Sequence, residues 1–241
     1  MRLEEITIDG EPCDLSVNLA LLFQHLRKPN GVRKLWVDAL CIDQANLAER
    51  GAQVAQMDRI YAHASTVHVW LGPHADGSND SIVLAEFLWR CAFVERISPT
   101  ELFTSGDEAA NMATLAALEK LTILLERPWW TRRWVVQEVA LAREVLVHCG
   151  RKTVEWRKLA YATLVGITEN VIRRLPSPCT HPVFERRADL EGLLGQLRTL
   201  QCTNPLDTVY ALLSIASDAE TWGIGAPDYD RSVVEVYMEV V

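Results

Sequence analysis

The stretch Leu35-Trp-Val-Asp-Ala-Leu-Cys-Ile-Asp-Gln44 decides the fold that the sequence predicts. Its first three residues are apolar without alternation, which is typical of a β-strand covered on both faces of a sheet. The polar residues that follow are Asp38, Cys41, Asp43 and Gln44. In open parallel sheets, ligands bind outside the carboxyl ends of the strands. We therefore expect a strand over residues 35–39 whose polar end serves chemistry, binds a partner, or only caps the next helix.

A helix and a second strand are expected after this stretch. Asn46 is a typical N-cap residue, and Glu49 stands three positions on, as in a capping box. Apolar residues at helical spacing continue to Ala64, and the run over residues 66–71 ends at a Gly-Pro pair. Strand, helix and strand in this order predict a right-handed parallel βαβ unit.

Further elements are expected on both sides of this unit. A hairpin turns at Asp9-Gly10, Ser16 caps the helix after it, and residues 145–148 form a third strand. The other patterns are helical, over residues 82–96, 109–126, 134–142, 154–175, 185–201, 204–213 and from 227 to the chain end. We expect an α/β domain over residues 1–150 and a helical extension over residues 151–241, truncated at its C-terminal helix.

The composition argues against several classes of function. The 241 residues are 49% hydrophobic and 23% charged, which is ordinary for one large or two small globular domains. The net charge of −8 argues against a nucleic-acid partner, and no apolar run reaches the roughly 18 residues that a membrane span needs. The six cysteines are scattered without a CxxC pair, which predicts free thiols in a reducing cytoplasmic compartment and no metal site.

Glu138 is the anomalous residue of the sequence. On a helical wheel its neighbours are Trp134, Val135, Leu141 and Ala142. A carboxylate in an apolar stripe is either paired or functional, because an unpaired buried charge is costly and such groups gather at functional sites. The structural alternatives are a boundary position that reaches solvent, or a salt bridge to Arg132, Arg133 or Arg143.

Other candidates also have structural alternatives. Asp38 and Asp43 follow a strand, where carboxylates commonly cap helices. Three tryptophans close in sequence either form core or wall a ligand cleft: Trp129, Trp130 and Trp134. The simple nucleotide-binding, hydrolase and zinc-protease motifs are absent from the sequence.

Two segments, residues 35–72 and 127–150, resemble the fungal heterokaryon incompatibility (HET) domain. The family pattern is a strand ending in WxDxxCIxQ, then ER, QV, M, IY and WLG, and later RxWxxQE. The matching residues here are Trp36, Asp38, Cys41, Ile42, Gln44, Glu49, Arg50, Gln53, Val54, Met57, Ile60, Tyr61, Trp70, Leu71, Gly72, Arg133, Trp134, Gln137 and Glu138. The family normally begins with a strand of the type ALSYxWG, which is missing ahead of Arg2.

The resemblance implies a fold and an activity. HET domains are regarded as remote relatives of TIR domains, so the implied fold is α/β with a TIR-like (flavodoxin-like) parallel sheet flanked by helices. Some TIR domains cleave NAD+ with the glutamate of a W-x-x-x-E pattern, which here is Trp134 to Glu138. Glu138 is then the catalytic candidate and NAD+ a substrate, so no cofactor is expected. The implied substrate-binding candidates are Asp38, Cys41, Asp43, Gln44 and Trp134.

Two classes of function are compatible with this resemblance. One is a cell-death effector in self/non-self recognition that cleaves NAD+. The other is a non-catalytic signalling module, in which the same surfaces bind a second copy of the chain or another incompatibility protein. The missing first strand favours the second class, because it would leave the edge of residues 35–39 exposed for pairing.

Overall fold

A small mixed sheet lies at the centre of the computed structural model, which describes residues 3–8, 10–104, 107–168 and 188–240. Its strands are β3 (Val67–Trp70), β4 (Val145–Cys149) and β5 (Lys152–Glu155), in the order β3-β4-β5. β3 and β4 are parallel, with Val67 opposite Val145, whereas β4 and β5 are antiparallel. The chain is therefore α/β, as predicted, but the sheet is mixed and not purely parallel.

The strand expected over residues 35–39 is not formed. Residues 32–37 have no regular secondary structure, and α2 (Asp38–Cys41) begins where the strand should continue. Val37 is extended, with φ −138° and ψ 118°, but its carbonyl accepts from the amides of Leu40 and Cys41 instead of from a neighbouring strand. An extended segment needs a partner strand to satisfy its backbone groups, and here the first turn of α2 takes that role. The predicted βαβ unit is wrong for this reason.

The N-terminal hairpin and helix are confirmed. β1 (Leu3–Ile8) pairs antiparallel with β2 (Glu11–Ser16), and α1 (Val17–Leu26) follows. The Ser16 hydroxyl accepts from the amide of Leu19 at 3.2 Å, as an N-cap does. α1 contacts the sheet, because the Trp70 indole donates to the Asn18 side chain at 3.0 Å.

The helix expected from residue 46 to 64 is divided into α3 (Leu47–Val54) and α4 (Met57–His63). Asn46 caps α3 by accepting from the amide of Glu49 at 3.1 Å. The Glu49 carboxylate accepts from the amide of Asp43 at 3.0 Å. Only one half of the predicted capping box is therefore confirmed, and Glu49 instead fixes the turn that follows α2.

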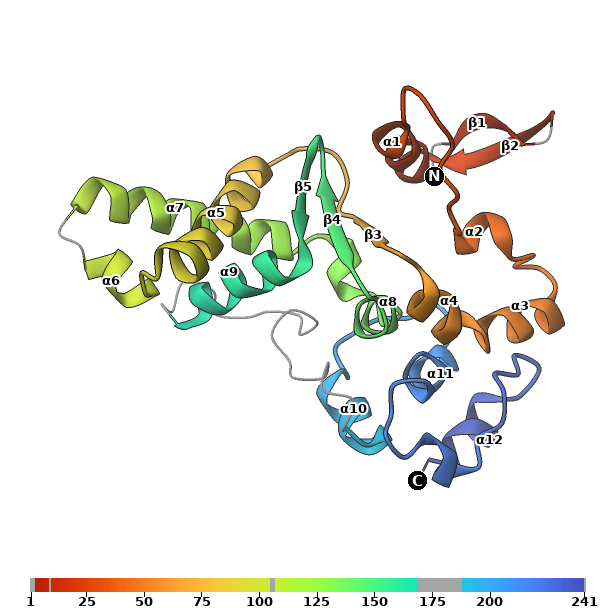
Figure 1. Cartoon of the computed structure of the whole chain (residues 1–241). Coiled ribbons are helices and arrows are strands. Elements are labelled where there is room, and N and C mark those ends of the chain that lie inside the picture. Colours follow the sequence, from red (N-terminus) through yellow and green to blue (C-terminus); the bar gives the residue numbers. More distant parts are fainter. Residues whose placement is uncertain (1–2, 9, 105–106, 169–187, 241) are drawn as a thin grey trace.

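A group of helices lies together at one end of the sheet (Figure 1). They are α5 (Ser78–Arg90) with the π-helical turn η1 (Cys91–Glu95), α6 (Pro99–Thr104), α7 (Glu108–Leu125) and α9 (Trp156–Thr168). The helix predicted over residues 154–175 thus begins later than expected, and residues 169–175 lie outside the described part. The short elements η2 (Pro128–Thr131) and α8 (Val135–Ala140) connect α7 to β4.

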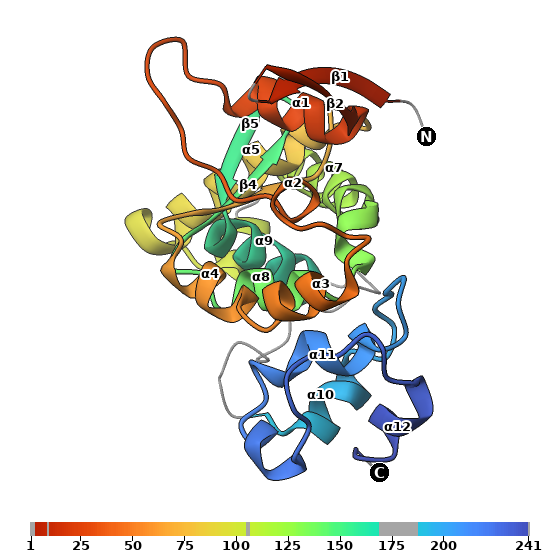
Figure 2. The ribbon, with the colours of Figure 1, turned by 90° about the vertical axis from the view of Figure 1, so that its right-hand side faces the viewer.

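The C-terminal elements lie together on the other side of α3 and α8 (Figures 1 and 2). They are α10 (Leu190–Gln196), α11 (Asp207–Leu213), η5 (Ala219–Trp222) and α12 (Val233–Tyr237). The last helix starts later than predicted, because Ser232 and Glu235 form its capping box. Residues 185–187 of the predicted helix lie outside the described part. β5 extends the sheet past residue 150, and the division there into two units stays a prediction.

A backbone bridge joins the C-terminal elements to the rest. Arg132 and Gln201 form an isolated parallel bridge, in which the amide of Arg133 donates to Gln201 O at 2.8 Å. The Arg133 guanidinium is buried and donates to Leu197 O at 2.9 Å and to Thr208 O at 3.1 Å. These bonds hold α10 and α11 against the segment that leads into α8.

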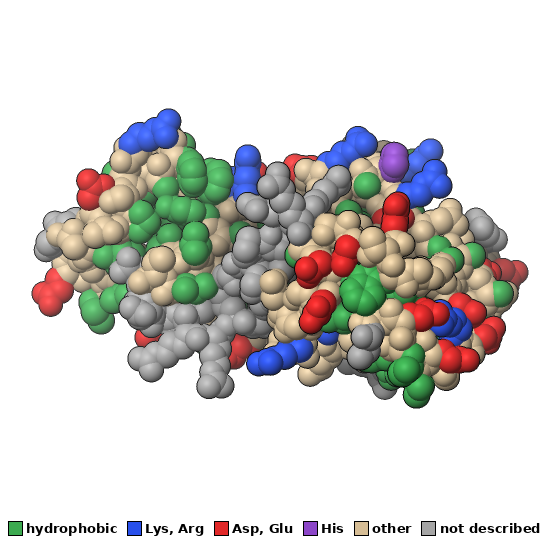
Figure 3. Space-filling model, turned by 90° about the horizontal axis from the view of Figure 1, so that it is seen from below, with side chains coloured by type: hydrophobic (Ala, Val, Ile, Leu, Met, Phe, Trp, Pro, Cys, Tyr) green, Lys and Arg blue, Asp and Glu red, His purple; other side chains and the backbone are tan. Residues whose placement is uncertain are grey.

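The surface carries apolar side chains at the end formed by α5, α7 and α9. Figure 3 shows hydrophobic side chains gathered toward that end of the face it presents. The exposed large hydrophobic residues of these helices and of η1 are Val83, Phe93, Val94, Met112, Ile123 and Leu164. Within the described ranges, no helix combines the length and the apolar character that a membrane crossing requires.

Trp130 is the largest side chain that is fully buried in the core. Its ring packs against Trp129 and Trp156, and its indole donates to Leu124 O at 3.0 Å. Trp129 is also buried, so two of the three clustered tryptophans belong to the core, as one of the two alternatives predicted. Only Trp134 is left for a ligand site.

We expect Trp130→Ala to lower the free energy of unfolding by about 3–5 kcal/mol, the usual cost of deleting a buried aromatic ring. Trp130→Phe retains a ring but loses the hydrogen bond, so its cost should be smaller, about 1–2 kcal/mol. Urea unfolding followed by circular dichroism measures both. A loss below about 1 kcal/mol for Trp130→Ala would contradict the packing described here.

Candidate active site

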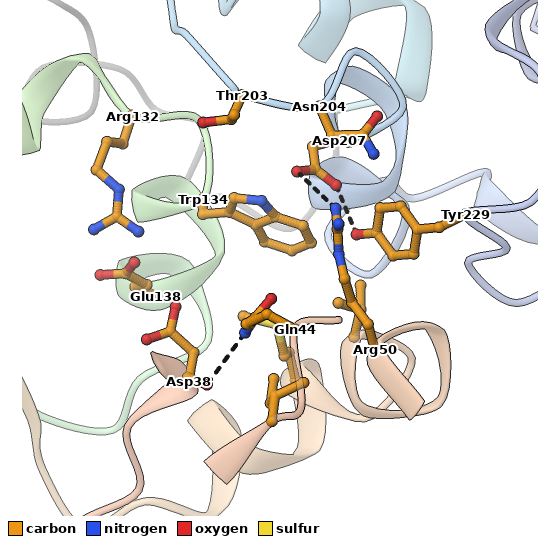
Figure 4. Close-up of a pocket in the computed structure, with 13 residues that line it drawn as sticks. Asp38, Gln44, Arg50, Arg132, Trp134, Glu138, Thr203, Asn204, Asp207 and Tyr229 are labelled. Carbon is orange, nitrogen blue, oxygen red and sulfur yellow. Dashed lines mark hydrogen bonds and ion pairs between the residues drawn. The ribbon is translucent and has the colours of Figure 1, made fainter. Parts of the chain in front are cut away.

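A pocket of about 290 Å³ lies between α2, α3, α8 and the C-terminal elements (Figure 4). Its wall from the first part of the chain is made by Asp38, Ile42, Gln44, Arg50, Val54, Met57, Arg132, Trp134 and Glu138. The facing wall is made by Thr203, Asn204, Asp207 and Tyr229. The volume is just below the roughly 300–1,000 Å³ that is usual for small-molecule sites.

Glu138 and Asp38 lie on the same side of this pocket, although they are far apart in sequence. Glu138 is in the first turn of α8, and Asp38 is the first residue of α2. Both side chains are half-buried, and Figure 4 shows their carboxylates near each other. The two acids that the sequence singled out are thus brought to one cleft, even though no strand carries Asp38.

The salt bridges considered for Glu138 are made elsewhere or are loose. Arg133 is turned toward the carbonyls of α10 and α11, and Arg143 donates to Ala62 O at 2.9 Å. Arg132 lines the pocket, with its guanidinium on the side of Glu138 in Figure 4. Among the residues that the structure describes, no Lys or Arg nitrogen lies within 4.0 Å of the Glu138 carboxylate.

Burial raises the pKa of Glu138, and the nearby Asp38 carboxylate raises it further. The Arg132 charge and a hydrogen bond with the Trp129 side chain act in the opposite direction but are outweighed. Tyr61 on α4 belongs to the same environment. Its pKa lies well above the ordinary value because of burial, to which the charges of Glu138 and Asp38 add. The pocket therefore holds two close carboxylates, and the Tyr61 phenol responds to their charges without lining the pocket.

Gln44 and Trp134 also line the pocket, whereas two of the predicted residues do not. The Gln44 amide donates to Asp38 O at 3.2 Å and so holds the turn after α2. Asp43 accepts from the amide of Ala45 at 3.0 Å and so closes a local turn, whereas the cap of α3 is Asn46 and not Asp43. Cys41 is exposed, and its neighbour Ile42 is the residue of this turn that is buried against the pocket.

The other end of the pocket was not predicted from the sequence. There Tyr229 donates to the buried Asp207 carboxylate at 2.7 Å, and Arg50 lies 4.0 Å from the same carboxylate. The backbone of α3 also lies close to the C-terminal elements. A Cβ atom on Gly51 would lie 2.6 Å from the carbonyl oxygen of Pro227. The helices predicted to start at residues 204 and 227 were the local signals in this region, and neither reveals the partner on α3.

Three histidines form a row outside the pocket, with His68 on β3, His148 on β4 and His25 on α1. His148 on β4 contacts His25 through Nδ1 at 3.0 Å and His68 through Nε2 at 2.8 Å. Burial, with the other two histidines and Arg33, lowers the pKa of His148 to about 3. Because His148 uses two different ring nitrogens, the row does not converge on one point. In the described part of the chain, no group of three or more His, Cys, Asp or Glu residues is placed to hold a metal ion.

Comparisons with known proteins agree with the sequence pattern. The family model described as "Heterokaryon incompatibility protein (HET)" matches residues 1–138. The chain is also similar to "Heterokaryon incompatibility protein 6, OR allele" of Neurospora crassa, with 30% identity over an alignment of 296 positions. That alignment covers 96% of this chain but 43% of the relative, so the chain spans less than half of the relative's length. No solved structure matches.

The raised pKa of Glu138 predicts a stability change that can be measured without knowing a ligand. A carboxyl whose pKa is higher in the folded state binds protons more tightly there, so stability falls as the pH rises through the folded-state pKa. We expect Glu138→Gln to increase the free energy of unfolding by roughly 0.5–1 kcal/mol at about pH 8. The gain should shrink toward zero near pH 4, where the unfolded carboxyl is also largely protonated.

Glu119→Gln is the matched control, because Glu119 is exposed on α7 and the change in charge is the same. It should alter the free energy of unfolding by less than about 0.5 kcal/mol at both pH values. A Glu138→Gln variant less stable than the parent chain at about pH 8 would contradict the environment described for Glu138.

Proposed function

The chain belongs to the heterokaryon incompatibility (HET) family, and on this basis we propose that it acts in heterokaryon incompatibility by cleaving the nicotinamide glycosidic bond of NAD+. One observation carries the enzymatic part of this proposal. Glu138 and Asp38 line one pocket, with the Trp134 ring beside them. The spacing of Trp134 and Glu138 is that of the W-x-x-x-E pattern, whose glutamate is catalytic in some TIR domains.

The chemistry needs a negative charge beside the ribose and little else. When the C1′–N bond breaks, its electron pair leaves with nicotinamide, which departs as a neutral molecule and requires no acid. The ribosyl centre becomes oxocarbenium-like, and a carboxylate fixed next to it lowers the energy of that state. Glu138 takes this role, and Asp38 adds to the negative potential. Water then adds to C1′ and releases a proton, which completes ADP-ribose.

The size and polarity of the pocket support the nicotinamide riboside half as the part that enters. A volume of about 290 Å³ suits one ring and one sugar better than a whole dinucleotide. Trp134 is half-buried and offers a face for an aromatic ring, and the nicotinamidium of NAD+ is cationic. The carboxylates of Asp38 and Glu138 lie beside that position and attract the positive charge.

A second candidate function is assembly without catalysis. The exposed hydrophobic side chains on α5, α7 and α9 favour it, because apolar patches on a surface mark sites of association. The partner would be a second copy of the chain or another incompatibility protein. The two functions are compatible, since a site can also become active upon assembly.

The decisive measurement is NAD+ consumption with detection of released nicotinamide. We expect turnover by the chain and a loss of at least about 100-fold in Glu138→Gln and Glu138→Ala, since fixed charge at a reacting centre contributes factors of this size. Glu119→Gln, which removes an equal charge from the surface, should retain full activity. Absence of turnover at high protein concentration, or equal turnover in the Glu138 variants, would refute NAD+ cleavage and leave assembly as the candidate.

If assembly activates the site, the turnover per molecule should rise steeply with protein concentration. Val94→Asp places a charge at a hydrophobic position that is 71% exposed and should shift that rise to higher concentration. Light scattering on the same samples reports the association directly. A specific activity that is constant over a hundredfold range of concentration would argue against activation by assembly.

A further inference from the structure

Arg50 lies at the end of the pocket opposite to Glu138, with the Trp134 ring between them (Figure 4). It comes from α3, whereas its partners Asp207 and Tyr229 come from the C-terminal elements. The other arginine of the pocket, Arg132, lies near the carboxylates and lowers the pKa of Glu138. The pocket therefore has an acidic end, where two carboxylates lie near Arg132, and a separate end, where Arg50 lies beside the Asp207 carboxylate.

The Arg50 guanidinium is held loosely by its partners. Its Nη2 lies 4.0 Å from Asp207 Oδ2, longer than a charge-assisted hydrogen bond of about 2.7–2.9 Å. The guanidinium carbon stands 3.7 Å from the centre of the Tyr229 ring, so one flat face of the group is covered. A guanidinium has five N–H donors at its edge, and in the described part of the chain only Asp207 and Tyr229 meet it.

The buried Asp207 carboxylate has a second partner besides Arg50. Its side chain is 9% exposed, and it accepts a hydrogen bond of 2.7 Å from the Tyr229 hydroxyl. Burial and this hydrogen bond raise the pKa of Tyr229 far above its ordinary value, so the phenol keeps its proton and continues to donate. Arg50 can then direct its free donors to an anion in the pocket while the Asp207 carboxylate stays paired.

We propose that Arg50 binds the diphosphate of the dinucleotide substrate and so selects phosphorylated over unphosphorylated nicotinamide ribosides. The inference rests on the proposed function for its substrate, but the anion site can be tested by itself. In NAD+ the cationic nicotinamide and the anionic diphosphate lie on opposite sides of one ribose. The acidic end of the pocket suits the cation, and at the other end Arg50 has guanidinium donors left for the diphosphate. An arginine fork matches phosphate oxygens bidentately.

The test compares the binding of ADP-ribose and adenosine by isothermal titration calorimetry. Both ligands contain adenine and ribose, but only ADP-ribose carries the diphosphate. We expect Arg50→Gln to weaken the binding of ADP-ribose by about 10- to 100-fold, the range for loss of a charge-assisted hydrogen bond, and to leave adenosine unaffected. Arg50→Lys keeps the positive charge but loses the planar guanidinium, so its affinity for ADP-ribose should lie between those of the parent chain and Arg50→Gln.

Arg59→Gln is the matched control, because Arg59 is exposed on α4 and does not line this pocket. It should bind ADP-ribose as the parent chain does. Thermal unfolding shows whether Arg50→Gln is folded, and Arg50→Lys is the second variant if it is not. Equal ADP-ribose binding in Arg50→Gln and Arg59→Gln, or no ADP-ribose binding by the parent chain at millimolar concentration, would overturn the inference. ADP-ribose binding that requires Arg50 without NAD+ turnover would refute NAD+ cleavage and uphold the anion site.

Discussion

The pocket depends on one buried cation, Arg133. The residue is 2% exposed, and its guanidinium donates to carbonyl oxygens of Leu197 and Thr208, so a single side chain joins the C-terminal elements to the segment that leads into α8. Burial lowers the pKa of this group, which is the sign of the desolvation that the contact costs. The carbonyl partners and the backbone bridge to Gln201 offset that cost. Together with the contacts of Arg50 and Gly51, they hold α11 opposite α2 and α3, where it forms the second wall of the pocket.

The residues that line the pocket therefore come from distant parts of the chain. Arg133 lies two residues before α8 and Glu138 is in the first turn of that helix, so the contact that joins the C-terminal elements also fixes the start of the helix that carries the acid. Asp207 and Tyr229 arrive on the facing wall, beyond the residues that match the family model. The match to the family model therefore ends at residue 138, within the site, while the lining of the pocket continues to Tyr229.

The sequence predicted those features whose causes are local. The Ser16 and Asn46 caps, the hairpin and the existence of the strands β3 and β4 follow from residues close in the chain, although the pairing of these two strands with each other does not. Glu138 was recognised because a charged residue in an apolar stripe is anomalous by itself. The strand at residues 35–39 failed because pairing is decided by what lies beside a segment. The meeting of Arg50 with Asp207 was missed because the two are more than 150 positions apart and neither is unusual in its own neighbourhood.

In the row of His68, His148 and His25, the direction of hydrogen-bond donation is determined by Arg33. Arg33 Nη1 lies 3.4 Å from His68 Nε2, and because a guanidinium can only donate, that nitrogen must accept. The single proton of neutral His68 is then on Nδ1 and points to His148 Nε2, which places the His148 proton on Nδ1, toward His25 and Thr153. The tautomer of His68 thus determines the tautomer of each following histidine in the row. One arginine in the irregular segment before α2 therefore fixes the order of protons from that segment through β3 and β4 to α1.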